Sequence, residues 1–494
     1  MLPCRSYLLG FACLGLVQLA HAQPNPIPIP QPPTIPPGHA SPAYIGAPAT
    51  PNPVIGVAAI PQNPFLAANG RSNIHGDTYM SDLYFTGGPL GKSPAVLSTV
   101  LGGDAVGIGF DQKGRIITAA LGQTVRLFLI HPATLATLAT RSLGSRTAEG
   151  GGYFYLDSND HLVIGGPGGF SVLKVTDNPP APPVFTLLKE YDLSTAIAAG
   201  DAVEALLPDF SGRIWFTTVG GTVGTVDPTA RTIATLSLTG EQIRNSTATD
   251  ETGGVFVASD HALYRFDADA QGKPTITWRE VYDRGYRVKA GQYSRGSGTT
   301  PTLMGTQYVT ITDNADPQMH VNVYRRAATV EGNRLLCSVP VFQPGQSATE
   351  NSLIATEHSI IVENNAGWRA DAVHGKILGT PFPGITRIDV DDSGCRTVWT
   401  NDSVRIPSAV SKLSVQNGLI YTYIYEKGPN GGANGTDDYY FTAIDFHTGQ
   451  TVFQRLIGQG TYFDNYYSAI HLGPDGRTAY VGVLAGLVAI RDTQ

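Results

Sequence analysis

The chain has 494 residues, of which 42% are hydrophobic and 15% are charged, and its formal net charge is −7. It contains no basic run, which argues against nucleic acids and anionic membrane surfaces as partners. Its 57 glycines and 35 prolines, together with the low charge, favour many short strands and turns over long helices.

The first 22 residues have the pattern of a signal peptide. Arg5 supplies a positive charge, an apolar run extends over residues 7–19, and Ala20-His21-Ala22 is a small-residue cleavage site. The apolar run is short for a membrane span, and no later segment qualifies as one. The sequence therefore predicts a secreted or periplasmic protein without a transmembrane segment.

Residues 23–68 are rich in proline and alanine and have too few large apolar residues for a core. This composition predicts an extended, disordered tether, with or without a binding partner. After removal of the signal peptide the chain keeps two cysteines, Cys337 and Cys395. In an oxidising compartment we expect them to form a disulfide bond, with two separate buried thiols as the alternative.

A short Asp/Gly phrase recurs along the rest of the chain. It reads Asp111-Gln-Lys-Gly-Arg-Ile-Ile and, later, Asp209-Phe-Ser-Gly-Arg-Ile-Trp. Looser copies begin at Asp157, Asp250, Gln416 and Asp475. A polar turn between two short apolar strands predicts a hairpin, and one hairpin roughly every 40 to 60 residues is typical of a β-propeller. We therefore predict a single all-β propeller over residues 69–494, with eight blades, or seven as the alternative.

The last repeat supplies too few strands for a complete blade. An open sheet edge would leave unpaired backbone groups, so a propeller closes its ring with a strand from the other end of the chain. Residues 78–101, which include the apolar segment 95–100, are the expected donor. We expect the closed ring to be a monomer.

Carboxylates and amides gather where the repeat is blurred, between about residues 296 and 365. The candidates are Asp313, Asn314, Glu350, Asn351, Glu363 and Asn364. Glu350 and Asn351 stand at the head of a predicted inner strand, and the other four end the strands that follow inner strands. The mouths of inner strands line the central tunnel of a propeller, so these groups could converge on one face. Their oxygens are the ligands that Ca²⁺ prefers, and a bound cation polarises a carbonyl or quinone oxygen. The alternative is that these side chains only cap turns.

His75 is the histidine with the strongest case for a catalytic role. It lies two residues from Asp77 in the segment that leads from the tether into the ring. An imidazole oriented by a carboxylate can serve as a general base, so we predict that His75 and Asp77 are catalytic, with a structural histidine as the alternative. The aromatic residues Trp368, Tyr466 and Tyr467 either wall a pocket for an apolar or sugar ligand or pack in the core.

Four strings carry a resemblance to known proteins. They begin at Ser72 (Ser-Asn-Ile-His-Gly-Asp-Thr), Gly296 (Gly-Ser-Gly-Thr-Thr-Pro-Thr), Thr312 (Thr-Asp-Asn-Ala-Asp-Pro) and Ala348 (Ala-Thr-Glu-Asn-Ser). Through them, residues 72–490 resemble a group of secreted bacterial β-propellers of unassigned activity, which implies the fold and export.

More distantly, the chain is similar to two propeller classes. One is the regucalcin, gluconolactonase and paraoxonase class, which holds a tunnel Ca²⁺ and hydrolyses lactones or esters. The other is the quinoprotein dehydrogenases, with eight blades around Ca²⁺ and pyrroloquinoline quinone.

Three functions remain open from the sequence. The first is a calcium-dependent, lactonase-like or esterase-like hydrolase with its site at the central tunnel. The second is a non-catalytic propeller that binds a small molecule or an extracytoplasmic protein. The third is a quinone-dependent oxidoreductase.

Overall fold

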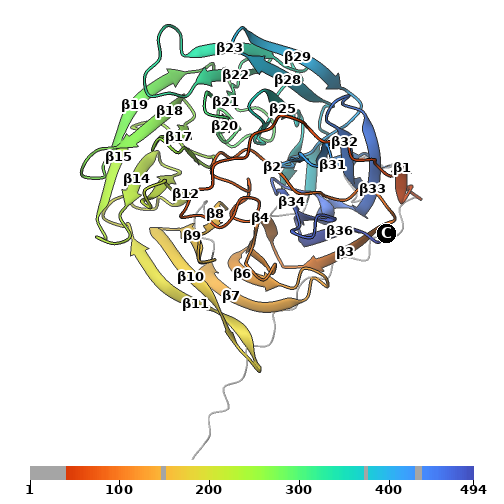
Figure 1. Ribbon diagram of the computed structural model, residues 1–494, viewed down its shortest axis with the longest axis horizontal. Helices are drawn as coiled ribbons and strands as arrows, with labels where there is room; N and C mark the ends of the chain where they lie inside the picture. Colours follow the sequence, from red (N-terminus) through yellow and green to blue (C-terminus); the bar gives the residue numbers. More distant parts are fainter. Residues whose placement is uncertain (1–39, 146–151, 372–375, 429–436) are drawn as a thin grey trace, which may run out of the picture.

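The computed structural model describes residues 40–145, 152–371, 376–428 and 437–494. These residues form eight sheets arranged as blades around a central axis, each with four antiparallel strands at its core (Figure 1). The predicted all-β propeller and its eight blades are confirmed. The predicted signal peptide, residues 1–22, lies outside the described residues. No helix of the described segments has the length and apolar character needed to span a bilayer.

The strands of each blade are numbered from the axis outward in the first four blades. Blade 1 consists of β4 (Asp104–Phe110), β5 (Ile116–Leu121), β6 (Thr124–Ile130) and β7 (Thr137–Ser145). Blade 2 consists of β8 (Phe154–Leu156), β9 (Leu162–Gly166), β10 (Gly169–Asn178) and β11 (Ala181–Asp192). Blade 3 consists of β12 (Val203–Pro208), β13 (Ile214–Thr218), β14 (Thr222–Val226) and β15 (Ile233–Ser237). Blade 4 consists of β16 (Ala248–Thr249), β17 (Val255–Ala258), β18 (Ala262–Ala268) and β19 (Pro274–Val281).

The remaining blades follow the same order, with one inserted hairpin. Blade 5 consists of β20 (Thr302–Met304), β21 (Tyr308–Thr312), β22 (His320–Arg325) and β23 (Leu335–Pro340). Blade 6 consists of β24 (Ile354–Ala355), β25 (Ser359–Glu363), β28 (Ile385–Asp391) and β29 (Gly394–Asn401), and β26 (Arg369–Asp371) and β27 (Lys376–Gly379) form the inserted hairpin. Blade 7 consists of β30 (Lys412–Ser414), β31 (Leu419–Glu426), β32 (Asp438–Asp445) and β33 (Thr451–Gln459), followed by the short 3₁₀ helix η1 (Thr461–Phe463).

Blade 8 joins the two ends of the described chain. Its strands β34 (Ile470–Leu472), β35 (Thr478–Val483) and β36 (Gly486–Asp492) come from the C-terminus, and its outermost strand β3 (Pro94–Val100) comes from the N-terminal part. β3 pairs with β36 in an unbroken antiparallel register, from Pro94 opposite Asp492 to Val100 opposite Gly486. The prediction that residues 78–101 supply the closing strand is therefore confirmed.

The recurring Asp/Gly phrase forms the turn between the first two strands of several blades. In blade 3, one carboxylate oxygen of Asp209 accepts hydrogen bonds from the amides of Ser211 (2.9 Å) and Arg213 (3.0 Å). Gly212 has a φ of +87°, a conformation that favours glycine. The phrase recurs because an aspartate closes the turn and a glycine adopts its left-handed position.

The outer edges of blades 5 and 6 are joined by a covalent bond. Cys337 in β23 and Cys395 in β29 form a disulfide with their Cα atoms 6.0 Å apart. The predicted pairing is therefore present in the structure. The bond ties together two blades whose only other connection in sequence is the segment between β23 and β24.

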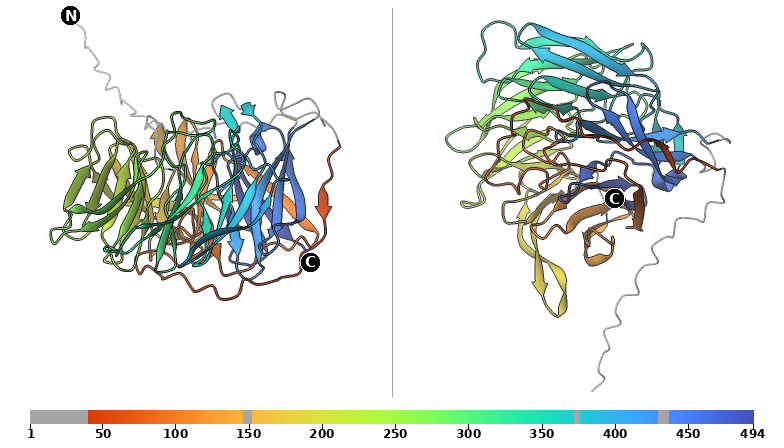
Figure 2. Two further views of the ribbon diagram at one scale, coloured as in Figure 1. Left: turned by 90° about the horizontal axis from the view of Figure 1, so that it is seen from above. Right: turned by 45° about the vertical axis from the view of Figure 1, so that its right-hand side comes forward.

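Residues 40–68, which composition assigns to the tether, lie against the ring instead of extending from it. β1 (Tyr44–Gly46) pairs with the outer strand β33 of blade 7, and Ala49, Leu66 and Ala67 are buried. From there residues 47–68, which we call the strap, cross one face of the ring (Figure 2). The strap has no core of its own, but it contributes backbone hydrogen bonds to turns of the ring, such as Asn52 N to Asn417 O (2.9 Å).

The strap leads into a segment that fills the tunnel. Residues 69–84, which we call the plug, pass through the centre of the ring and include the short strand β2 (Leu83–Tyr84), parallel to β30. Carbonyl groups of the plug accept hydrogen bonds from amides of the inner strands of six blades. The acceptors are Arg71, Ser72, Thr78, Tyr79, Ser81 and Asp82, and the donors are, in the same order, Phe110, Leu156, Thr249, Leu303, Ala355 and Leu413. All residues from 72 to 84 are buried, so the plug closes one end of the tunnel.

Candidate functional site

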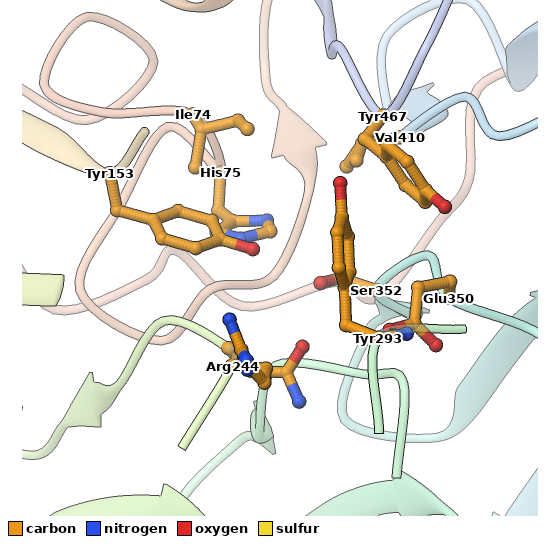
Figure 3. A pocket seen from close by; sticks show the side chains of 10 residues that line it. Ile74, His75, Tyr153, Arg244, Tyr293, Glu350, Ser352, Val410 and Tyr467 are labelled. Carbon is orange, nitrogen blue, oxygen red and sulfur yellow. Dashed lines mark hydrogen bonds between the residues drawn. The ribbon is translucent and has the colours of Figure 1, made fainter. Parts of the chain in front are cut away.

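A pocket lies at the axis above the plug, on the side away from the strap. Its floor includes Ile74 and His75 of the plug, and its walls come from the segments that lead into the inner strands of six blades. These wall residues are Tyr153, Arg244, Asn245, Tyr293, Glu350, Ser352, Val410 and Tyr467. The space that it encloses is about 40 Å³, and the pocket opens to solvent. Figure 3 shows Tyr153 and Tyr293 facing it from opposite sides.

His75 is the predicted site residue that the structure places in this pocket. Its side chain is 1% exposed, and its Nδ1 lies 3.0 and 3.1 Å from the two carboxylate oxygens of Asp82. Its backbone amide donates to the side-chain oxygen of Asn73 (2.8 Å), which fixes the turn around it. Because a carboxylate accepts only, Nδ1 carries the proton in this contact, and Nε2 presents its lone pair. Nε2 has no hydrogen-bond partner among the described residues.

The carboxylate that orients His75 is Asp82 rather than the predicted Asp77. Asp82 also forms an ion pair with Lys412, and both side chains are fully buried. Lys412 donates a second hydrogen bond to the carbonyl oxygen of Ile74 (2.8 Å). Burial lowers the pKa of Lys412, and the charge of Asp82 opposes this shift. Lys412 thus compensates the charge of Asp82 beneath the pocket and ties it to the backbone next to His75.

Asp77 has a structural role in the plug. Its carboxylate accepts hydrogen bonds from the amides of Tyr79 (2.8 Å) and Ser81 (3.3 Å) and from the hydroxyl of Ser81. Burial raises its pKa to about 7, and its hydrogen bonds with Ser81 oppose this shift. These contacts shape the turn that carries the plug from blade 4 to blade 6. The expectation that Asp77 assists His75 directly does not match this geometry.

Glu350 is half-buried in the pocket wall, at a point where two loops are in close contact. Its Oε1 accepts the amide of Tyr293 (3.1 Å). Burial raises its pKa to about 8, and the hydrogen bond from the Tyr293 amide and the positive charge of Arg244 oppose this shift. A carboxyl group with a raised pKa is suited to hold a proton and donate a hydrogen bond. A Cβ atom on Gly298 would lie 2.1 Å from the carbonyl oxygen of Thr349, so the Gly-rich loop allows this close approach.

Two further predicted ligands meet each other below the pocket wall. The side-chain nitrogen of Asn351 donates to Oε2 of Glu363 (3.2 Å), and both residues are buried. Burial raises the pKa of Glu363 to about 8, and the nearby Ser411 hydroxyl and Asn351 amide oppose this shift. Oε1 of Glu363 and Oδ1 of Asn351 have no partner among the described residues.

The other three predicted ligands support loops elsewhere. Asp313 binds Nδ1 of His320 (2.9 Å), and burial raises its pKa. The amide of Asn314 donates to two backbone carbonyls, and so does the amide of Asn364, so both side chains brace loops. These contacts match the turn-capping alternative.

The six predicted calcium ligands therefore do not converge. Only Asn351 and Glu363 are in contact, and within the described segments no group of three or more His, Cys, Asp or Glu side chains has a geometry that could hold a metal ion. The donor set does not fit the tunnel calcium site that the sequence suggested. The quinone hypothesis relied on the same donor set, so it gains no support from it.

Contact with a carboxylate does not by itself distinguish His75 from other histidines. His161, His261 and His320 each lie within 3.0 Å of an aspartate oxygen, but all three are about a third exposed. His75 differs because it is buried, its aspartate is paired with a buried lysine, and its second nitrogen faces a pocket.

Several residues of the site have no clear signal in the sequence. Asp82 stands seven residues after His75, but Lys412 is 330 residues away from Asp82 and only the fold brings them together. Tyr153, Arg244 and Tyr293 share one property, their position in a segment that leads into an inner strand. Once the blade boundaries are known, that position narrows the search to these segments.

Comparison with known proteins supplies little about activity. No family model matches the chain. An uncharacterized protein of Archaeoglobus fulgidus is 28% identical over 327 residues, which is 60% of this chain and 62% of the length of that protein. The match thus spans less than two thirds of either protein, and the function has to be argued from the pocket.

Proposed function

We propose that the central pocket binds a small molecule and hydrolyses an ester or lactone bond in it, with His75 as the general base. The observation that carries this proposal is the free Nε2 of His75, which faces the pocket while Nδ1 is held by Asp82. A buried imidazole in this tautomer accepts a proton from a water molecule, and the carboxylate behind it stabilises the imidazolium that forms.

The other polar groups of the pocket complete a hydrolytic step. Water transfers a proton to Nε2 of His75 while its oxygen attacks the carbonyl carbon. The guanidinium of Arg244, which points into the pocket in Figure 3, stabilises the negative charge that develops on the carbonyl oxygen. The protonated carboxyl group of Glu350 donates its proton to the leaving oxygen as the carbon–oxygen bond breaks. The products are a carboxylic acid and an alcohol, or a hydroxy acid from a lactone.

The proposal is tested with the purified protein and a panel of simple esters and lactones. His75→Gln and Asp82→Asn should each lower kcat by about 100-fold or more, the usual contribution of a positioned base. His320→Gln is the matched control, because it removes an imidazole in contact with an aspartate outside the pocket. Full activity in His75→Gln, or an equal loss in the control, would refute the assignment.

The second candidate is a ligand-binding propeller without catalysis. The same pocket supports it, because a pocket walled by side chains of six blades and closed at one end is a binding site whether or not a reaction follows. It is favoured if the pocket binds a ligand and no ester or lactone is hydrolysed.

We further propose that the protein is exported. The disulfide between Cys337 and Cys395 supports this, since such bonds persist mainly in oxidising compartments. Cell fractionation of the full-length chain, together with mass spectrometry of its N-terminus, tests both export and cleavage after Ala22.

A further inference from the structure

Three of the ten residues that line the pocket are tyrosines: Tyr153, Tyr293 and Tyr467. Tyr293 is 46% exposed, so its ring is accessible to a ligand that enters the pocket. Tyr153 is half-buried on the opposite side (Figure 3). The pocket is thus a slot between aromatic side chains.

The wall around Tyr467 is held in a strained conformation. Tyr466 and Tyr467 have φ angles of +42° and +62°, in the left-handed region that bulky residues avoid. Two hydrogen bonds fix this backbone, from Tyr466 N to Asp464 Oδ1 (2.9 Å) and from Tyr467 N to Ser408 Oγ (2.8 Å). The surrounding structure therefore imposes the position of the Tyr467 ring.

The rings of this wall also support one another. Trp368 lies edge-on to Tyr467 at a centroid distance of 5.0 Å, and its indole nitrogen donates to Asp464 (3.2 Å). Tyr293 lies 5.0 Å from Tyr467 on another side. The hydroxyl of Tyr467 donates to the carbonyl oxygen of Gly291, so it is already occupied. Tyr467 therefore offers the pocket its ring rather than a free hydroxyl.

Polar groups stand between the aromatic walls. Arg244, Asn245, Glu350 and Ser352 line the same pocket. The amide nitrogen of Asn245 donates to the carbonyl of Ser297 (3.0 Å), which fixes the plane of that amide. The enclosed space is small, about 40 Å³, so a bound ring must extend into the open mouth of the pocket.

We propose that this slot binds one saccharide ring, so that the substrate is an acylated monosaccharide. The apolar face of a sugar ring packs on a tyrosine, and its hydroxyl groups bond to planar amide, carboxyl and guanidinium groups at the ring edge. The slot offers this combination between Tyr153, Tyr293 and the polar residues. This inference rests on the proposed function only for the ester, since the binding of the ring itself is independent of His75 chemistry.

Ligand-detected saturation-transfer NMR on the full protein tests the slot. The probes are methyl β-D-glucopyranoside, methyl β-D-galactopyranoside and methyl α-D-mannopyranoside, with p-cresol and cyclohexanol as ring-shaped comparators without several hydroxyls. At least one sugar should bind at millimolar concentration. Tyr293→Ala and Tyr153→Ala should each weaken it by about 3- to 10-fold, the value of one aromatic contact. Tyr286→Ala is the control, because Tyr286 is 73% exposed and lies outside the pocket.

The outcomes separate this inference from the proposed function. His75→Gln should fail to hydrolyse the acetate of the sugar, whereas Tyr286→Ala should bind the sugar and hydrolyse its acetate as the wild type does. Sugar binding without hydrolysis of any acetylated sugar would refute the hydrolase and keep the slot. Binding of p-cresol alone, no binding of any sugar, or equal weakening by Tyr286→Ala would overturn the saccharide assignment.

Discussion

Replacing Glu363 with glutamine should stabilise the ring at high pH and change little at low pH. Glu363 is 4% exposed, and burial raises its pKa to about 8, whereas a glutamate of an unfolded chain titrates near about 4.3. Between these two pH values the unfolded chain releases the proton while the folded chain keeps it. The free energy of unfolding therefore falls as the pH rises through this window, and it levels off above about pH 8.

The size of the effect follows from the separation of the two pKa values. A separation of about 3.5 pH units corresponds to about 5 kcal/mol, an upper limit because a buried site relaxes when it ionises. For a domain of this size, about 1 kcal/mol shifts the melting temperature by about 1 °C. Glu363→Gln should therefore melt about 3–5 °C above the wild type at pH 8.5 and within about 1 °C of it at pH 4.5.

Thermal unfolding followed by near-ultraviolet circular dichroism, in matched buffers at both pH values, measures this difference. Glu331→Gln is the control, because Glu331 is exposed and its replacement should shift both melting temperatures equally. If Glu363→Gln shifts the melting temperature by the same amount at both pH values, Glu363 is ionised in the folded protein and the reasoning fails.

Three further predictions concern the site and the disulfide. If Glu350 donates the proton to the leaving group, ester hydrolysis should decline as the pH rises through about 8, since the donor is lost there. Glu350→Gln should remove that decline, and a wild-type profile that stays flat from pH 7 to 9 would contradict the role. Replacing Cys337 and Cys395 with serine should lower the free energy of unfolding by about 4 kcal/mol, because the bond closes a loop of 58 residues; an unchanged urea midpoint would contradict this. Of the six predicted calcium ligands only Asn351 and Glu363 are in contact. Metal analysis of the purified protein should therefore find no stoichiometric Ca²⁺, and one Ca²⁺ per chain that is lost in Glu363→Gln would contradict this.

The fold was predictable because its signal is local. Asp209 and Gly212 form their turn with neighbours a few residues away, so the same phrase marks each blade wherever it appears. Ring closure followed from one physical requirement, that no sheet edge is left unpaired. Because the last blade lacks a strand, this requirement correctly identified the segment that contains β3 as the donor.

The site was less predictable because its contacts are distant in sequence. His75 could be selected from its own segment, and Asp77 was predicted as its partner. Only the path of the plug in the structure shows that Asp82, and not Asp77, contacts the imidazole. We predicted Asp313 as a calcium ligand because it ends a strand near the tunnel. In the structure its carboxylate is instead in contact with Nδ1 of His320. Composition also assigned the strap to the tether, because hydrogen bonds from backbone groups leave no trace in the side chains.

The plug also determines when the folding of this protein can be completed. Residues 69–84 leave the ribosome before any blade, yet their hydrogen-bond partners extend from Phe110 to Leu413. The plug can form its final contacts only after most of the ring has been synthesised, because those contacts span several hundred residues of chain. Such long-range contacts slow folding, so the native contacts of this chain remain incomplete until its synthesis is nearly finished.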